Sequence, residues 1–147
     1  MKPGMICLLT GWLIVSACLA DGIPKTDSVT VDIQMPAIYF GAGDEFWLHI
    51  ETRSLSGNPI DCRLFVILRI YDSFFMYPSW RASYPPGYNA DWADVIIDDE
   101  IRVILDTVTF PDDWTIVIDD LQFATACASP SWELISNIDR VDWSVGP

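Results

Sequence analysis

The sequence predicts an all-β protein, built as an antiparallel sandwich of roughly seven to nine strands. Apolar and polar residues alternate with a period of two in several short segments, and Gly, Pro and Asp separate these segments at short intervals. No long segment has the 3.6-residue period of an amphipathic helix. Because 51% of the 147 residues are hydrophobic and 20% are charged, the chain has ample apolar material for one packed core.

The first two strands are predicted by alternation. Residues 28–35 place an apolar side chain at every second position, and Pro36 ends the strand because it cannot donate to a sheet ladder. The composition of residues 41–44 predicts a turn. Alternation resumes over residues 46–51, where His49 falls on the polar face of the expected strand.

The middle of the chain contains one continuous apolar run and one aromatic segment. Residues 64–68 are apolar at every position, which favours a central strand that is covered on both faces. The aromatic segment spans residues 71–88, and its three prolines exclude a helix. We expect a short strand over residues 74–77, followed by an extended edge segment and a turn.

The last third of the chain predicts four more strands. They are expected at residues 95–97, 101–109, 114–126 and 132–143, with acidic or proline-containing turns between the first three. Asn137 lies near the middle of the last one and indicates a bulge or a turn there.

The N-terminus has the pattern of a secretory signal peptide over residues 1–20. Lys2 precedes an apolar run at residues 6–15, and small residues follow before the polar Asp21. The run is shorter than the span of about 20 apolar residues that a transmembrane helix requires. Residues 21–147 are then expected to form a single β-sandwich domain in a secreted, extracellular or cell-surface protein.

Two cleavage chemistries compete in this signal. Cleavage after Ala20 would give a soluble product, because small residues precede it at the spacing that signal peptidase requires. Val15-Ser16-Ala17-Cys18 instead resembles a lipobox, in which the signal ends at Ala17 and Cys18 is lipidated. The second route predicts a periplasmic or outer-membrane lipoprotein, with the lipid on Cys18 as its only membrane contact.

Charge and motif content exclude several classes of function. A formal net charge of −13 repels phosphate backbones, so nucleic acid is not expected as a partner. With His49 as the only histidine and no nucleophile, zinc or phosphate-binding motif, we expect no enzyme activity and no cofactor. Acidic pairs at the expected turns could bind calcium, but none has the spacing of a calcium loop, so solvated turns are the favoured interpretation and no metal site is predicted.

Several motifs together resemble an immunoglobulin-like β-sandwich module, often found at the C-terminus of large secreted bacterial proteins. The motifs are Met35-Pro36, Phe40-x-x-Gly43-Asp44-x-Phe46-x-Leu48, the strand from Leu64 to Leu68 with Tyr71, Tyr77-Pro78-Ser79-Trp80 and Val141-x-Trp143-x-x-Gly146-Pro147. The resemblance implies an extracellular accessory domain, and it provides no catalytic residues.

Cys62 and Cys127 are the only cysteines beyond the signal, and they are predicted to form a disulfide. A lone pair in an oxidising compartment is typically bridged, and no further Cys or His indicates a zinc site. In an immunoglobulin-like order, Cys62 opens the third strand and Cys127 closes the sixth, which are adjacent and antiparallel. The alternative is two buried, reduced thiols.

The aromatic segment is the predicted binding surface. Its candidate residues are Tyr71, Phe75, Tyr77, Trp80, Tyr84 and Tyr88. Exposed rings would stack on sugars or proteins, which predicts a binding or adhesion module for an extracellular glycan or protein. The alternative interpretation is that these rings pack in the core. A second functional hypothesis is a structural or assembly subunit of a surface structure, whose exposed edge pairs with a neighbour by strand addition.

Overall fold

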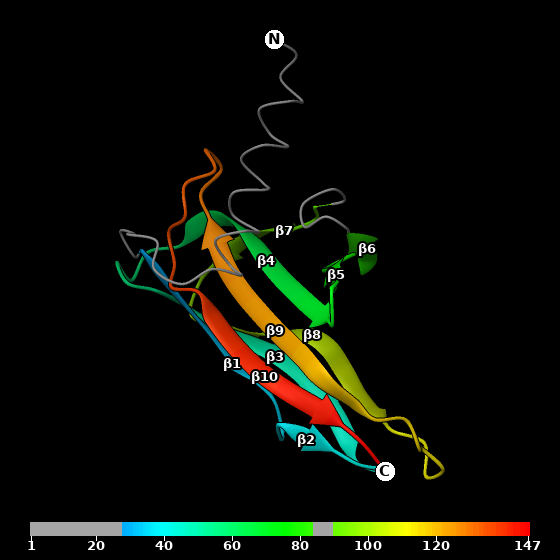
Figure 1. Ribbon diagram of the computed structural model, residues 1–147. Coiled ribbons are helices and arrows are strands. Elements are labelled where there is room, and N and C mark those ends of the chain that lie inside the picture. The colour runs from blue at the N-terminus through cyan, green and yellow to red at the C-terminus, as the bar shows by residue number, and fades with distance from the viewer. Residues whose placement is uncertain (1–27, 84–89) are drawn as a thin grey trace.

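Two β-sheets pack face to face in the computed structural model, which describes residues 28–83 and 90–147 (Figure 1). The smaller sheet has the strand order β1-β3-β8, with β1 at Val29–Gln34, β3 at Glu45–Ser54 and β8 at Glu100–Thr109. The larger sheet has the order β2-β10-β9-β4-β5-β6, and β7 also pairs with β4. Its strands are β2 at Tyr39–Phe40, β4 at Ile60–Ile70, β5 at Ser73–Met76, β6 at Arg81–Ser83, β7 at Ala93–Ile97, β9 at Ile118–Ala128 and β10 at Asp139–Val145.

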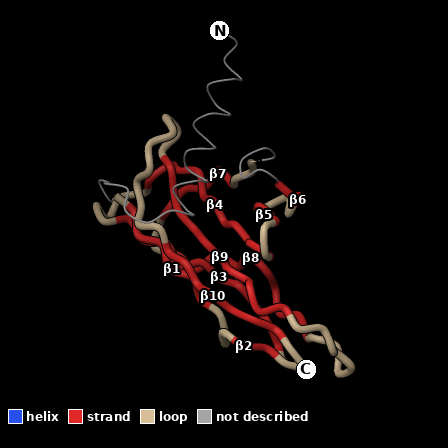
Figure 2. Tube along the Cα trace, viewed as in Figure 1, coloured by secondary structure: helices blue, strands red, loops and turns tan. Residues whose placement is uncertain are grey.

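The all-β prediction is confirmed, since the described residues form strands, turns and loops (Figure 2). The structure has ten strands among the described residues, against the expected seven to nine. The difference arises because β2 and β6 are too short to show an alternation pattern in the sequence. No helix in the described ranges is long and apolar enough to cross a membrane.

The main core lies between the sheets and follows the predicted alternation. Val29, Val31 and Ile33 of β1 are buried, as are Leu48 and Ile50 of β3, while the residues between them face outward. Burying one face of each strand removes apolar surface from water, which stabilises the folded state by about 25 cal/mol for each Å² buried. This burial fixes which face of each strand points inward.

β4 is covered on both faces, as its continuous apolar sequence predicts. Leu64 and Val66 belong to the core between the sheets. Phe65 and Ile67 point to the opposite face of the larger sheet, where they form a second buried cluster with small residues of β9. The structure therefore places β4 in the centre of the larger sheet, between β9 on one side and β5 and β7 on the other.

Two predicted strands begin later in the structure than expected. β9 begins at Ile118 instead of residue 114. The Trp114 N–H closes a turn by donating to the Pro111 carbonyl at 3.0 Å, and its Nε1–H donates to the Ile116 carbonyl, so residues 114–117 lie outside the sheet. β10 begins at Asp139 instead of residue 132. Asn137 is neither a bulge nor a turn within a strand, because it precedes β10 and its side chain binds the backbone of β1.

Candidate functional site

The described rings of the predicted aromatic surface do not share one exposed face. Tyr71 is 47% exposed, whereas Phe75, Tyr77 and Trp80 are half-buried. The rings of Tyr77 and Trp80 meet edge to face with their centroids 5.8 Å apart, and both pack against the main core. Tyr77 and Trp80 therefore contribute to packing, as the alternative interpretation of the segment anticipated.

The remaining parts of the N-terminal and aromatic predictions lie outside the described residues. They are the signal peptide at residues 1–20, Cys18, Tyr84 and Tyr88. Each of them stays a prediction.

The two cysteines lie on adjacent antiparallel strands, as predicted. Cys127 of β9 pairs with Leu64 of β4, so Cys62 is its diagonal neighbour on the same buried face. The structure contains no bond between the two sulfur atoms. A hydrogen bond with Cys127 lowers the pKa of the Cys62 thiol, although burial acts in the opposite direction. The predicted adjacency of the two strands is therefore correct, but the predicted disulfide is not formed in the structure, where both cysteines are thiols.

Sequence reasoning missed a stack of one guanidinium and two indoles near the cysteines. The Arg63 guanidinium lies 4.0 Å from the ring centroid of Trp132 and 5.6 Å from that of Trp92. Asp94 is 3.7 Å from the Arg63 Nε. Trp132 has a backbone φ of +71°, which is uncommon for a bulky residue. Through this stack, the loop before β7, which contains Trp92, and the loop after β9, which contains Trp132, both pack on the outer face of β4 at Arg63.

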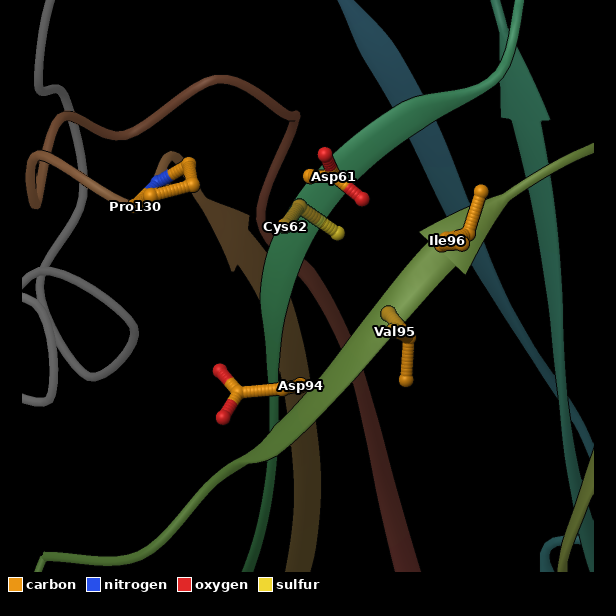
Figure 3. Close-up of a pocket in the computed structure, with 6 residues that line it drawn as sticks. All are labelled: Asp61, Cys62, Asp94, Val95, Ile96 and Pro130. Carbon is orange, nitrogen blue, oxygen red and sulfur yellow. The ribbon is translucent and has the colours of Figure 1, made fainter.

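A hollow of about 350 Å³ lies at the same end of β4 (Figure 3). It is lined by Asp61, Cys62, Asp94, Val95, Ile96 and Pro130. Figure 3 shows Asp61 and Cys62 on β4, Asp94, Val95 and Ile96 on the neighbouring β7, and Pro130 on a separate loop. The hollow is acidic and open, and no described cation lies among its lining residues.

One edge of the smaller sheet, β1, is closed by side chains and loop carbonyls. The Val31 N–H donates to the Asn137 Oδ1, and the Asn137 Nδ2 donates to the Val31 carbonyl, both at 2.8 Å. The Ile33 N–H donates to an Asp139 carboxylate oxygen at 2.7 Å, and the Val29 N–H donates to the Ile135 carbonyl at 3.0 Å. The N–H groups of alternate residues are thus satisfied along the whole outer side of β1.

The opposite edge of the smaller sheet, β8, pairs only with β3 within the described ranges. Its side chains Ile101, Val103 and Val108 are 57%, 53% and 56% exposed. Ile101 is opposite Glu51, and Val103 is opposite His49 on the outer face of the sheet. The His49 ring in turn stacks on the Trp47 ring with a centroid distance of 4.5 Å.

The register identifies which backbone groups of β8 point away from β3. Residues 29, 31 and 33 of β1 direct their N–H groups outward, so residues 30, 32 and 34 bond to their partners on β3. Because the bonding side alternates along an antiparallel strand, Ile50 and Thr52 of β3 bond to β8, where they are opposite Arg102 and Glu100. The N–H and C=O groups of Ile101 and Val103 therefore face outward, and we call these two residues the open edge.

No protein-family model matches the chain, and no curated protein matches it. The crystal structure of Spo0M, a sporulation control protein from Bacillus subtilis, is similar to 82% of this chain with 15% sequence identity and a TM-score of 0.40. The match covers 50% of the Spo0M chain, so this chain spans about half the length of that protein. A likeness this weak adds nothing to a functional argument.

Proposed function

We propose that this chain is an exported, non-catalytic binding module that takes up an extended segment of another protein by adding it to β8. The observation that carries the proposal is the open edge, where backbone groups that point away from β3, with no described strand beside them, and exposed apolar side chains belong to the same two residues. An added strand gains main-chain hydrogen bonds from such an edge, and it gains selectivity from side chains that alternate along it.

The sandwich is proposed to be of the immunoglobulin-like kind. The adjacent order β10-β9-β4-β5 in one sheet and β1-β3-β8 in the other supports this assignment, and so does the short β2, which pairs parallel with β10. Modules of this kind are common on cell surfaces, which agrees with the expected export signal.

A glycan platform on the aromatic segment receives less support. A sugar site requires several flat rings that are open to solvent, and among the described candidates only Tyr71 is exposed. The open edge instead favours a protein ligand. A module that adheres to a partner and a subunit that assembles with a neighbour would use this edge in the same way.

Hydrogen exchange with a model strand tests the proposal. The probe is a ten-residue peptide of alternating Val and Thr, which is extended and uncharged. We expect it to slow amide exchange at Ile101 and Val103 and to leave the already closed edge at Val31 unchanged. Protection elsewhere, with none at the open edge, would overturn the proposal.

A matched pair of variants adds a control to this experiment. Val103→Lys places a charged side chain on the open edge, a substitution that blocks strand addition in natural sheets. Val117→Lys makes the same change at a residue that is 60% exposed and outside the strands. Binding should be lost in the first variant and kept in the second. Glycan-array binding that survives Val103→Lys would favour the aromatic segment instead.

A further inference from the structure

The surroundings of the open edge are strongly acidic. Residues 94–113 contain seven carboxylates and one guanidinium, a formal charge of −6. All seven acidic residues are exposed, and they are Asp94, Asp98, Asp99, Glu100, Asp106, Asp112 and Asp113. The negative charge therefore extends beyond both ends of β8 and also occurs within the strand.

The one basic group in this stretch is already engaged. The Arg102 guanidinium donates to the Ile96 carbonyl at 2.9 Å and forms an ion pair with Glu100. Its charge offsets one of the seven carboxylates. Asp94 lies 3.7 Å from the Arg63 Nε. The other five carboxylates form no ion pair with a described residue, and carboxylates at a surface attract basic groups at close range.

The side chains of β8 present two different rows to an added strand. Ile101 and Val103 lie on the outer face, opposite Glu51 and His49. Glu100 and Arg102 alternate with them and are opposite Thr52 and Ile50, whose side chains point toward the core. One row of an added strand would therefore lie beside apolar side chains, and the other would lie beside the acidic margin of the sandwich.

We propose that the segment added to β8 is basic, with Lys or Arg alternating with apolar residues. This inference rests on the proposed use of β8 for strand addition, and it names the chemistry of the partner. The apolar row of the segment contacts Ile101 and Val103, and its basic row neutralises the carboxylates around the edge. Two copies of this chain are disfavoured as partners, because each has a net charge of −13 and their edges would repel each other.

Three peptides of equal length separate charge from strand addition. Each has ten residues with Val at alternate positions, and the other positions are Lys, Thr or Glu. At low salt we expect the Val-Lys peptide to bind about tenfold more tightly than the Val-Thr peptide, and the Val-Glu peptide to bind least. Raising the salt to about 1 M should remove most of this preference, because the Debye length falls to about 3 Å.

Charge-reversal variants distinguish a local effect from the net charge of the protein. Asp98→Lys with Asp106→Lys changes two exposed residues around β8, and the preference for the Val-Lys peptide should fall at least about fivefold. Asp72→Lys with Asp119→Lys makes the same change in net charge on the larger sheet, at two exposed residues. This control should keep the preference.

The results of these experiments distinguish failure of the basic partner from failure of strand addition. If the Val-Thr peptide protects the open edge but the Val-Lys peptide binds no better, the basic partner is refuted and strand addition stands. An equal loss in both pairs of charge variants would also refute it, because net charge alone would then explain the preference. If no peptide protects Ile101 and Val103, strand addition itself fails. Self-association of the wild-type protein in sedimentation, lost in Val103→Lys, would make a second copy the occupant.

Discussion

Replacing Asn137 with alanine should destabilise the protein by about 2–3 kcal/mol. The side chain makes two hydrogen bonds of 2.8 Å to the Val31 backbone, one as acceptor and one as donor. Each such bond contributes about 0.5–1.5 kcal/mol net, and a backbone group that is left partly buried without a partner adds a further penalty. Asn137 precedes β10, so the substitution leaves the strand ladders of both sheets intact.

Urea unfolding with a matched control measures this loss. Asn58→Ala makes the same substitution in an exposed loop, and it should stay within about 0.5 kcal/mol of wild type. Amide exchange at Val31 should accelerate in Asn137→Ala and stay slow in Asn58→Ala. A change below about 0.5 kcal/mol for Asn137→Ala, with Val31 still protected, would show that water replaces the side chain and that β1 does not depend on it.

Three further predictions concern other parts of the chain. Trp132→Ala removes the ring that stacks on a guanidinium, and it should cost about 2–3 kcal/mol in urea unfolding, whereas a loss below about 1 kcal/mol would mean that the stack is not structural. Non-reducing peptide mapping should recover Cys62 and Cys127 as separate alkylated thiols, as in the structure, and a linked peptide pair would contradict this. Intact-mass analysis should find either a lipid-modified Cys18 or a chain that begins at Asp21, and a mass that still includes the whole signal peptide would contradict the export prediction.

Local alternation was sufficient to predict most of the strands. It located β1 and β3 because each buries one face, and it identified β4 as central because a strand covered on both sides has no polar face. It failed at residues 132–138, which contain apolar residues at strand-like spacing. There the chain is extended but outside a ladder, since the Ile135 carbonyl accepts from the start of β1. The spacing of apolar residues cannot distinguish a strand that is paired within a sheet from an extended segment that is not.

The candidate site could not be predicted from the sequence in the same way. Ile101 and Val103 have the alternation of core residues, yet they are exposed because β8 lies at the end of its sheet and this pair points outward. The position of a strand within a sheet depends on contacts that are distant in sequence, which no local pattern contains. The half-burial of Tyr77 and Trp80 could not be predicted either, because it depends on the core beneath them.

The closed edge at β1 limits the valency of the module. A sheet that is open on both sides could add a strand at each edge, and repeated addition would give an extended filament. Here Asn137 and Asp139 satisfy the backbone along β1, so the smaller sheet can grow in one direction only. Only one segment can therefore pair directly with this sheet, at β8, so each copy of the chain would hold a single directly paired segment.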